Sequence, residues 1–456
     1  MEYRIEKDTM GEVKVPADRL WGAQTQRSLE NFKIGDDKMP IEIIRAIALV
    51  KLASARANRA LSPERMTEKK LSLIESAVSD ILSGKLDGEF PLSVYQTGSG
   101  TQTNMNLNEV IANLGNKKAG EKILHPNDDI NMSQSSNDVF PTAMHIAIYL
   151  AVKNQLLPSA KELSEALAKI EAESSGIVKS GRTHLQDATP IAFSQEVGAW
   201  RGAINRDIEL ISSSIAPLLS LAIGGTAVGT GLNAKAGFDK MAAAEIAGLT
   251  GESFVSDENK FRQLSHKSEI CLAHGAIKTL AADLMKIAND IRWLASGPRC
   301  GLSEITIPEN EPGSSIMPGK VNPTQCEAVT MAAARVMGND TTVGICAASG
   351  NFQLNVYMPI IIYSFINSVK ILSDSMKSFA ENCVRGIKAN SDKMKTNLYN
   401  SLMTATALAP YIGYDNTAKA VHLAHEQGIT LREAVLSLSL LTEEEFDGYY
   451  KPEEMI

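Results

Sequence analysis

The chain has 456 residues, of which 44% are hydrophobic and only 5% aromatic, and its formal net charge is -8. This length suffices for more than one hydrophobic core, and a composition poor in aromatic residues favours helices over sheets. The negative charge and the lack of a basic run argue against a nucleic-acid partner, so an anionic substrate would need a local positive pocket.

The amino-terminal residues and the cysteines bear on the compartment. The chain is charged from Glu2 onward and offers neither the apolar core of a signal peptide nor the acid-poor character of a transit peptide. No stretch is long and apolar enough to span a bilayer. The five cysteines are widely spaced and form no Cys-x-x-Cys pair. We therefore expect a cytoplasmic protein with reduced thiols, without a membrane partner, a cofactor or a bound metal.

The first 40 residues mix short extended pieces, Tyr3 to Ile5 and Val13 to Val15, with turn residues. A helical pattern then runs from Pro40 to Leu61, and a second one follows Pro63 and ends near Gly84. We expect these patterns to form a helical amino-terminal region.

Two polar segments follow. Thr97 to Glu109 is a Gly-containing entry into a helix, where hydroxyls and amides at free N–H groups could bind an anion or merely cap the helix. His125 to Asp138 is nearly devoid of apolar residues and precedes a helix that we expect Pro141 to help start. It could be a solvated loop or a binding segment. His125 with its neighbouring acids is more typical of a hydrogen-bonded turn than of a metal site.

Long helical patterns dominate the central part of the chain, at roughly 140–173, 192–222, 262–296, 323–347 and 357–387. Several exceed the usual length of globular helices and are apolar on more than one face, which predicts a bundle that also packs against other chains.

Three more polar segments lie between these helices. Gly181 to Pro190 places His184 on a non-helical connection, where it could be structural or catalytic. Gly224 to Asn233 is glycine-rich but follows a helix, so it is not a nucleotide-binding turn. Gly313 to Glu327 combines glycines, prolines, two serines, a lysine and an asparagine, and is typical of a mobile loop that can close over a carboxylate, although a plain surface connection is the alternative.

After about Ser391 the helices become short, and Thr430 to Glu433 and Thr442 to Glu445 match the capping box. We expect three regions in a mainly α fold: a helical domain at 1–138, a long-helix domain at 139–391 and a small helical domain at 392–456 without a catalytic constellation.

The five polar segments resemble, in order, those of the class II fumarate hydratases of the fumarase/aspartase superfamily, and the likeness extends to Gly22 to Arg27. The core of this resemblance is Gly-Ser-Ser-x-Met-Pro-x-Lys-x-Asn-Pro, which begins here at Gly313. It implies a homotetramer with a shared helical bundle, active sites built from loops of different subunits, and reversible hydration of the dicarboxylate fumarate to L-malate, a step of the tricarboxylic acid cycle.

The aspartases of the same superfamily are the alternative, and a non-catalytic protein on this scaffold is a more remote one. His184, where aspartases carry glutamine, and the continuation Gly319 to Glu327 favour the hydratases. One departure concerns the family's secondary dicarboxylate site, where an arginine stands three residues before the histidine and this chain has Lys122. A lysine loses the bidentate guanidinium fork and puts the strength of that site in doubt.

The resemblance also implies roles for individual residues. Ser314 would handle the carbon-bound proton, with Lys320 and backbone N–H groups stabilising its alkoxide. His184 would activate water, oriented by Glu327. Lys320 and Asn322 would hold the carboxylate that becomes dianionic. Substrate binding falls to Ser99, Gly100, Thr101, Ser135, Ser136, Asn137, Thr183, Ser315, Val321 and Asn322, and the secondary site to Lys122, His125, Pro126, Asn127 and Asp128.

Overall fold

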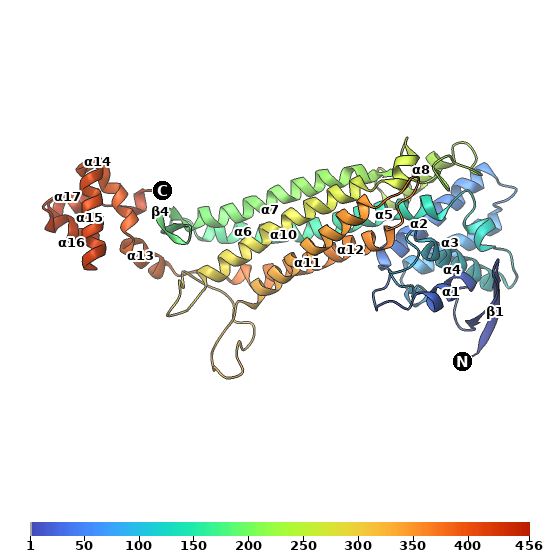
Figure 1. The fold of residues 1–456 in the computed structure, drawn as a ribbon, viewed down its shortest axis with the longest axis horizontal. Helices are drawn as coiled ribbons and strands as arrows, with labels where there is room; N and C mark the ends of the chain where they lie inside the picture. The colour runs from blue at the N-terminus through green and yellow to red at the C-terminus, as the bar shows by residue number, and fades with distance from the viewer. Residues whose placement is uncertain (1) are drawn as a thin grey trace. The chain divides into compact units, whose positions relative to one another are not determined.

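The computed structural model describes residues 2–456, which divide into two compact units. Unit 1 comprises residues up to Pro158 together with Glu209–Ala281 and Ala334–Ser373, and unit 2 comprises Ser159–Ile208, Ala282–Ala333 and Asp374–Ile456. Most residues lie in helices, which confirms the mainly α fold (Figure 1). Among the described residues, none of the helices combines the length and apolarity required to cross a membrane.

Unit 1 begins with an antiparallel hairpin of β1 (Tyr3–Asp8) and β2 (Gly11–Pro16), where the two extended pieces were predicted. The helices that follow pack closely and are drawn from blue to teal in Figure 1. They are α1 (Ala23–Asn31), α2 (Ile41–Leu61), α3 (Glu68–Leu82), α4 (Thr101–Ala119), the π-helix η2 (Pro126–Ile130) and α5 (Ser136–Ala151). The predicted helices after Pro40 and Pro63 are thus confirmed.

A buried carboxylate explains the early sequence motif Gly22 to Arg27. Glu109 of α4 accepts hydrogen bonds from the backbone N–H groups of Gly22, Gln24 and Thr25, at 2.8, 2.8 and 3.2 Å. It also accepts one from the Thr25 hydroxyl at 2.6 Å. The amino terminus of α1 is therefore capped by a residue of another helix, in keeping with the free N–H groups found there.

The long helices are α6 (Leu157–Glu173), α7 (Phe193–Ile215), α10 (Ser268–Leu294), α11 (Thr324–Ala348) and α12 (Met358–Asn382). Within unit 1, His274 of α10 is fully buried and contacts Asp340 of α11 and Ser368 of α12, at 2.9 Å each. Within unit 2, the indole of Trp200 on α7 donates to Asp290 of α10 at 3.0 Å. The helices predicted from periodicity are confirmed, although some of their ends differ.

Two helix ends and one continuous helix were predicted wrongly. Helix α5 begins at Ser136, because Ser135 and Asp138 form a capping box, so Pro141 lies inside the helix and does not start it. The helix expected to reach 222 ends at Ile215, and the short 3-10 helix η4 (Ala216–Leu219) follows with Pro217. The pattern at 262–296 is split into α9 (Lys260–Ser265) and α10.

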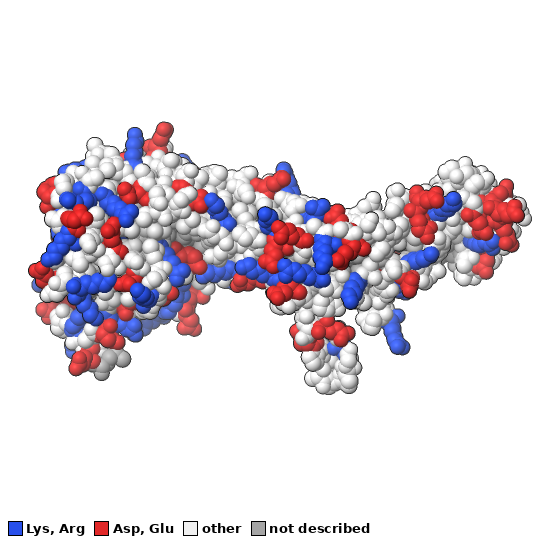
Figure 2. Space-filling view, turned by 180° about the vertical axis from the view of Figure 1, so that it is seen from behind, with Lys and Arg blue, Asp and Glu red and all other residues white. Residues whose placement is uncertain are grey.

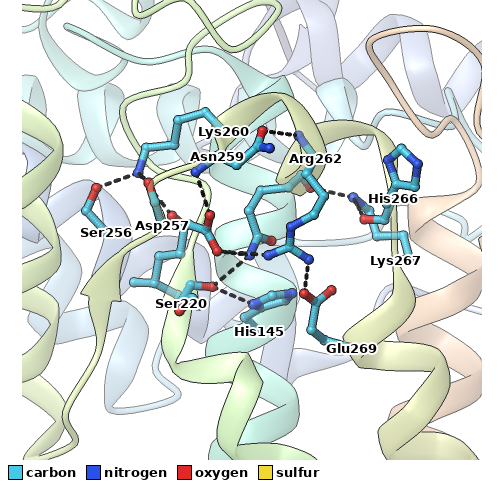
Figure 3. A network of polar contacts seen from close by, with 12 residues as sticks. His145, Ser220, Ser256, Asp257, Asn259, Lys260, Arg262, His266, Lys267 and Glu269 are labelled. Atoms are coloured by element: carbon cyan, nitrogen blue, oxygen red, sulfur yellow. Dashed lines mark hydrogen bonds and ion pairs between the residues drawn. The ribbon is translucent and has the colours of Figure 1, made fainter.

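A buried polar network holds that split (Figure 3). The ammonium of Lys267 is 2% exposed and donates to the backbone carbonyls of Gln263, Leu264 and His266, at 2.7, 3.1 and 3.0 Å. These carbonyls lie at the end of α9 and at the residue that follows it, where the helix leaves its last carbonyls without helical partners. Burial lowers the pKa of Lys267 to about 7. The lysine thus ends one helix just before the next begins.

The rest of unit 1 comprises a parallel pair of β5 (Ser220–Leu221) with β6 (Val255–Ser256), and α8 (Phe238–Thr250), which packs on α2. Unit 2 holds the antiparallel hairpin β3 (Val178–Thr183) and β4 (Gln186–Ala192), and β7 (Ile305–Thr306) paired with β8 (Lys388–Ala389).

The carboxyl-terminal helices of unit 2 form their own apolar cluster, which includes Leu408, Leu431, Val435 and Phe446. They follow α13 (Ser391–Asn400) and are η6 (Leu402–Leu408), α14 (Ala409–Ile412), α15 (Tyr414–Gln427), α16 (Leu431–Ser437) and α17 (Glu443–Tyr449). Both predicted capping boxes, at Thr430 and Thr442, are confirmed.

Acidic and basic side chains are interspersed on the face drawn in Figure 2. Several large apolar side chains of the long helices are nevertheless exposed in the single chain. They are Leu210, Leu272, Trp293, Met331 and Ile345, with 39 to 68% of their surface accessible. Where exposed apolar residues form a contiguous patch, they mark a surface that packs against another chain, whereas single ones are common on monomers.

Candidate active site

The segment Ser135–Asn137 is fixed at the start of α5 by a fully buried carboxylate. Asp138 accepts the backbone N–H of Ser135 at 2.9 Å, and its other oxygen accepts those of Gly224 and Thr226, also at 2.9 Å. Burial raises the pKa of Asp138 to about 6, despite these hydrogen bonds. The carboxylate therefore joins this segment to the glycine-rich loop.

The same loop accepts a second contact, because the side-chain amide of Asn137 donates to the carbonyl of Ala227 at 2.8 Å. The hydroxyl of Ser136 accepts a hydrogen bond from the amide of Asn104 at 3.0 Å. The two hydrogen bonds fix the positions of Ser136 and Asn137, which were predicted to bind substrate. Residues of the same chain thus hold this segment in place.

Ser99 and Thr101 meet at the start of α4, where their hydroxyl oxygens lie 2.8 Å apart. Gly100 between them has a φ of 71°, and a Cβ there would lie 2.2 Å from the ring of Phe140. Gly98 approaches the backbone of Val356 so closely that a Cβ would overlap its carbonyl oxygen. Only glycine fits these two positions, so the turn that presents the hydroxyls depends on them.

A buried lysine and several side-chain amides form a hydrogen-bonded cluster beside the start of α4. The buried ammonium of Lys51 donates to Asn131 and Gln134, at 2.9 and 3.0 Å. Asn131 also accepts the amide of Asn104, at 3.1 Å. Burial lowers the pKa of Lys51 to about 7. None of these residues was singled out from the sequence as functional, because a lysine within a helical pattern gives no sign of burial.

The residues predicted for a secondary site form a surface turn. Pro126 and Asn127 lie in η2, Lys122 is exposed, and the Nδ1 atom of His125 accepts the backbone N–H of Asp128 at 3.2 Å. The predicted hydrogen-bonded turn is therefore confirmed. The carboxylate of Asp128 lies 3.2 Å from the same imidazole nitrogen.

In unit 2, His184 occupies the tip of the β3–β4 hairpin and is exposed, as is Thr183 beside it. His184 and Leu185 have φ values of 56° and 59°, a conformation that favours glycine. Among residues 2–456 the imidazole of His184 has no hydrogen-bond or ion-pair partner. The side chain is thus held out from the hairpin and stays available.

The loop from Gly313 is closed by two hydrogen bonds. The N–H of Gly313 donates to the carbonyl of Lys320 at 2.8 Å, and the amide of Asn322 donates to the carbonyl of Gly313 at 2.7 Å. Inside this closure the hydroxyl oxygen of Ser314 accepts the backbone N–H groups of Ile316 and Met317, at 3.2 and 3.0 Å. Ser315 is exposed. Two N–H donors aimed at one hydroxyl oxygen favour its anionic form.

A cavity of about 690 Å³ lies beside this loop within unit 2. Four of the predicted site residues line it, namely Lys320, Val321, Asn322 and Glu327. Asn289 and Arg292 of α10 line it as well and were missed from the sequence, because they belong to a regular helical pattern. Ser314 and His184 are not among its lining residues. One chain therefore brings together the groups predicted to bind the carboxylate, without the two predicted proton-transfer groups.

The chain matches two family models, described as lyase over residues 11–338 and as the fumarase C carboxyl terminus over residues 405–456. It is 57% identical over 460 residues to a class II fumarate hydratase of Bacillus subtilis, covering 100% of this chain and 99% of the relative. A class II fumarate hydratase of Helicobacter pylori is 55% identical over 461 residues, with the same coverage of both chains.

The chain belongs to the class II fumarate hydratase family. A crystal structure of class II fumarase from Schistosoma mansoni superposes with a TM-score of 0.96 at 40% identity, covering 100% of this chain and 99% of that one. A fumarate lyase:delta crystallin structure from Brucella melitensis, bound to cobalt, gives 0.95 at 38% identity, with the same coverage. The similarity to fumarases thus includes the carboxyl-terminal helices.

Proposed function

We propose that this chain is a metal-independent class II fumarate hydratase that catalyses the reversible hydration of fumarate to L-malate. The observation that carries this assignment is the identity of 57% with a curated class II enzyme over the whole length of both chains. The polar segments at Ser99, Ser135, His184 and Ser314 all belong to that length.

The reaction needs a base for water on one carbon, an acid for the other carbon and stabilisation of the carbanion between them. We assign the carbon-bound proton to Ser314, whose oxygen already accepts two backbone N–H groups. A nearby ammonium, from Lys320, would favour the alkoxide further. Lys320 and Asn322 would bind the carboxylate into which the carbanion's charge spreads.

We assign activation of water to His184, with Glu327 favouring the imidazolium that results. In hydration His184 takes a proton from the water whose oxygen bonds to one carbon, and Ser314 delivers a proton to the other. The remaining substrate contacts would come from the segments at Ser99–Thr101 and Ser135–Asn137, from Thr183 and from Ser315. Their hydroxyl and amide groups suit a dicarboxylate.

We further propose a homotetramer whose active sites combine residues of different chains. Two observations support this proposal. The long helices expose Leu272, Trp293 and Met331, and Ser314 and His184 lie outside the cavity that Lys320 and Glu327 line. We also propose that the protein resides in the cytoplasm, because its five cysteines are free thiols.

A single assay tests the function. Loss of the ultraviolet absorbance of fumarate is followed in purified protein, first in water alone and then with added ammonia. A hydratase consumes fumarate without ammonia and produces L-malate. Consumption that requires ammonia would instead identify an aspartase-type ammonia-lyase, and no consumption in either case would favour a non-catalytic protein.

A further inference from the structure

A buried carboxylate, Glu304, binds the hairpin that carries His184. Glu304 has no exposed surface, and its two oxygens accept a bidentate pair of hydrogen bonds from the guanidinium of Arg182, at 2.6 and 3.0 Å. Arg182 stands two residues before His184. A bidentate pair between arginine and a carboxylate fixes orientation as well as distance.

Two further side chains complete the environment of this carboxylate. The ammonium of Lys179, also on β3 and 1% exposed, lies 3.1 Å from Glu304 and 2.9 Å from Glu196 of α7. From α13, the amide of Asn397 donates to Glu304 at 3.0 Å. The hairpin and the carboxyl-terminal helix α13 therefore share one acceptor, and α13 packs directly on β3.

The backbone around Glu304 is itself held. Its N–H donates to the carbonyl of Leu294 at the end of α10, at 2.9 Å, and its carbonyl accepts the N–H of Asn390 at 2.8 Å. The next residue begins β7, which pairs with β8. The backbone therefore holds the Glu304 carboxylate in position, and Arg182 of the hairpin binds to it.

We propose that Glu304 is a positioning residue for the reaction, which acts through Arg182 to hold the His184 hairpin against α13. The inference rests on the proposed function. It extends to the carboxyl-terminal region, since α13 contributes Asn397 to the same carboxylate and so helps to place the water-activating imidazole. The desolvated charges make this contact sensitive to the removal of any one partner.

The variants Glu304→Gln, Arg182→Ala and Asn397→Ala test this proposal. We expect turnover to fall about 10–100-fold in Glu304→Gln and Arg182→Ala, with KM changed less than threefold, because Thr183 alone of the assigned substrate-binding residues lies on this hairpin. Asn397→Ala removes one neutral donor and should lose a few-fold. The matched control is Arg201→Ala, which removes an ion pair of the same 2.6 Å length between Arg201 of α7 and Glu171 of α6, and it should keep wild-type turnover.

Rescue by a conservative variant separates positioning from general stability. Arg182→Lys keeps a cation attached to the hairpin beside Glu304, so it should retain more turnover than Arg182→Ala. Wild-type turnover in folded Arg182→Ala and Glu304→Gln, or equal loss in Arg201→Ala, would overturn the proposal. So would equal turnover in Arg182→Lys and Arg182→Ala.

A pH series provides a second readout. Burial would raise the pKa of Glu304, but the hydrogen bonds from Arg182 and the charge of Lys179 outweigh it, and the pKa lies below its usual value of 4.5. Glu196 and Asp187 are the other charged groups near this cluster. A carboxyl group with a lowered pKa in the folded state stabilises the fold above its usual pKa, and the effect is lost as pH falls through the folded value. The difference in urea midpoint between wild type and Glu304→Gln should therefore shrink below pH 4.5.

Hydrogen exchange of the peptide that contains His184 makes the test independent of activity. If the wild type hydrates no fumarate, the proposed function fails, and the exchange measurement still decides about Glu304. Faster exchange at residues 178–192 in Glu304→Gln, with exchange in α15 unchanged, supports the anchoring role. Unchanged exchange in the hairpin overturns it.

Discussion

The two units treat their predicted site residues differently. In unit 1, Ser136 and Asn137 are engaged by Asn104 and Ala227, and Asp138 fixes the segment to a second loop. In unit 2, His184 is exposed at a hairpin tip and has no partner within the described chain. The predicted binding residues of unit 1 are thus held within one chain, whereas the proposed tetramer would have a neighbouring chain complete the surroundings of His184.

The largest effect should come from the proton-transfer residues of unit 2. Ser314→Ala and His184→Asn should each be nearly inactive. If the two variants are unfolded together and reassembled in equal amounts, a site works when its serine and histidine come from the complementary chains, which random mixing allows for roughly a quarter of sites in a closed symmetric assembly. The measurement is fumarate hydration, with each variant reassembled alone as the control. No recovery in mixed tetramers would mean that one chain supplies both residues.

Glu327→Gln should have the next largest effect. The amide can still accept a hydrogen bond but cannot stabilise the imidazolium of His184, so turnover should fall on the order of 10²-fold, while the melting temperature stays near that of the wild type. The pH–rate profile is the measurement. An unmoved profile with intact turnover would contradict the pairing of Glu327 with His184.

Asp138→Ala tests the role of the segment Ser135–Asn137 in unit 1. The change leaves three backbone N–H groups without their acceptor and should cost about 1–3 kcal/mol of unfolding free energy. We expect KM to rise more than turnover falls, because the residues affected bind substrate. Urea denaturation and steady-state kinetics measure both effects, with the exposed residue change Asp36→Ala as a control. A selective loss of turnover would place this segment in the chemistry instead.

Removal of metal should have the smallest effect, in either unit. Prolonged dialysis against a chelator should leave the rate of hydration unchanged, because the proposed roles fall entirely to serine, histidine and lysine side chains. A large loss that a divalent ion restores would contradict this assignment.

The fold was predictable from the sequence where local signals act alone. Apolar periodicity located the long helices, and the boxes at Thr430 and Thr442 located two short ones. The prediction failed at Pro141, because the capping box of Ser135 and Asp138 starts the helix earlier than the proline would. The hydrogen bonds of the capping box decide where the helix starts, and the general preference of proline for the first turn does not.

The candidate site was predictable only in part, for a physical reason. Segments such as Gly313 to Glu327 carry their chemistry within a few residues, so a resemblance can identify them. Arg182 and Glu304 are 122 residues apart, and an isolated glutamate gives no indication of its partner. Interactions of this kind depend on tertiary packing, which periodicity does not describe.

The left-handed backbone at His184 and Leu185 has a consequence for protein engineering. Non-glycine residues in this conformation cost on the order of 1 kcal/mol each, so Leu185→Gly should relieve strain at a position whose side chain is exposed. The same change would widen the range of orientations open to the imidazole beside it. A search for heat-resistant variants of this enzyme should therefore find Leu185 readily, and the variants it yields should be slower catalysts.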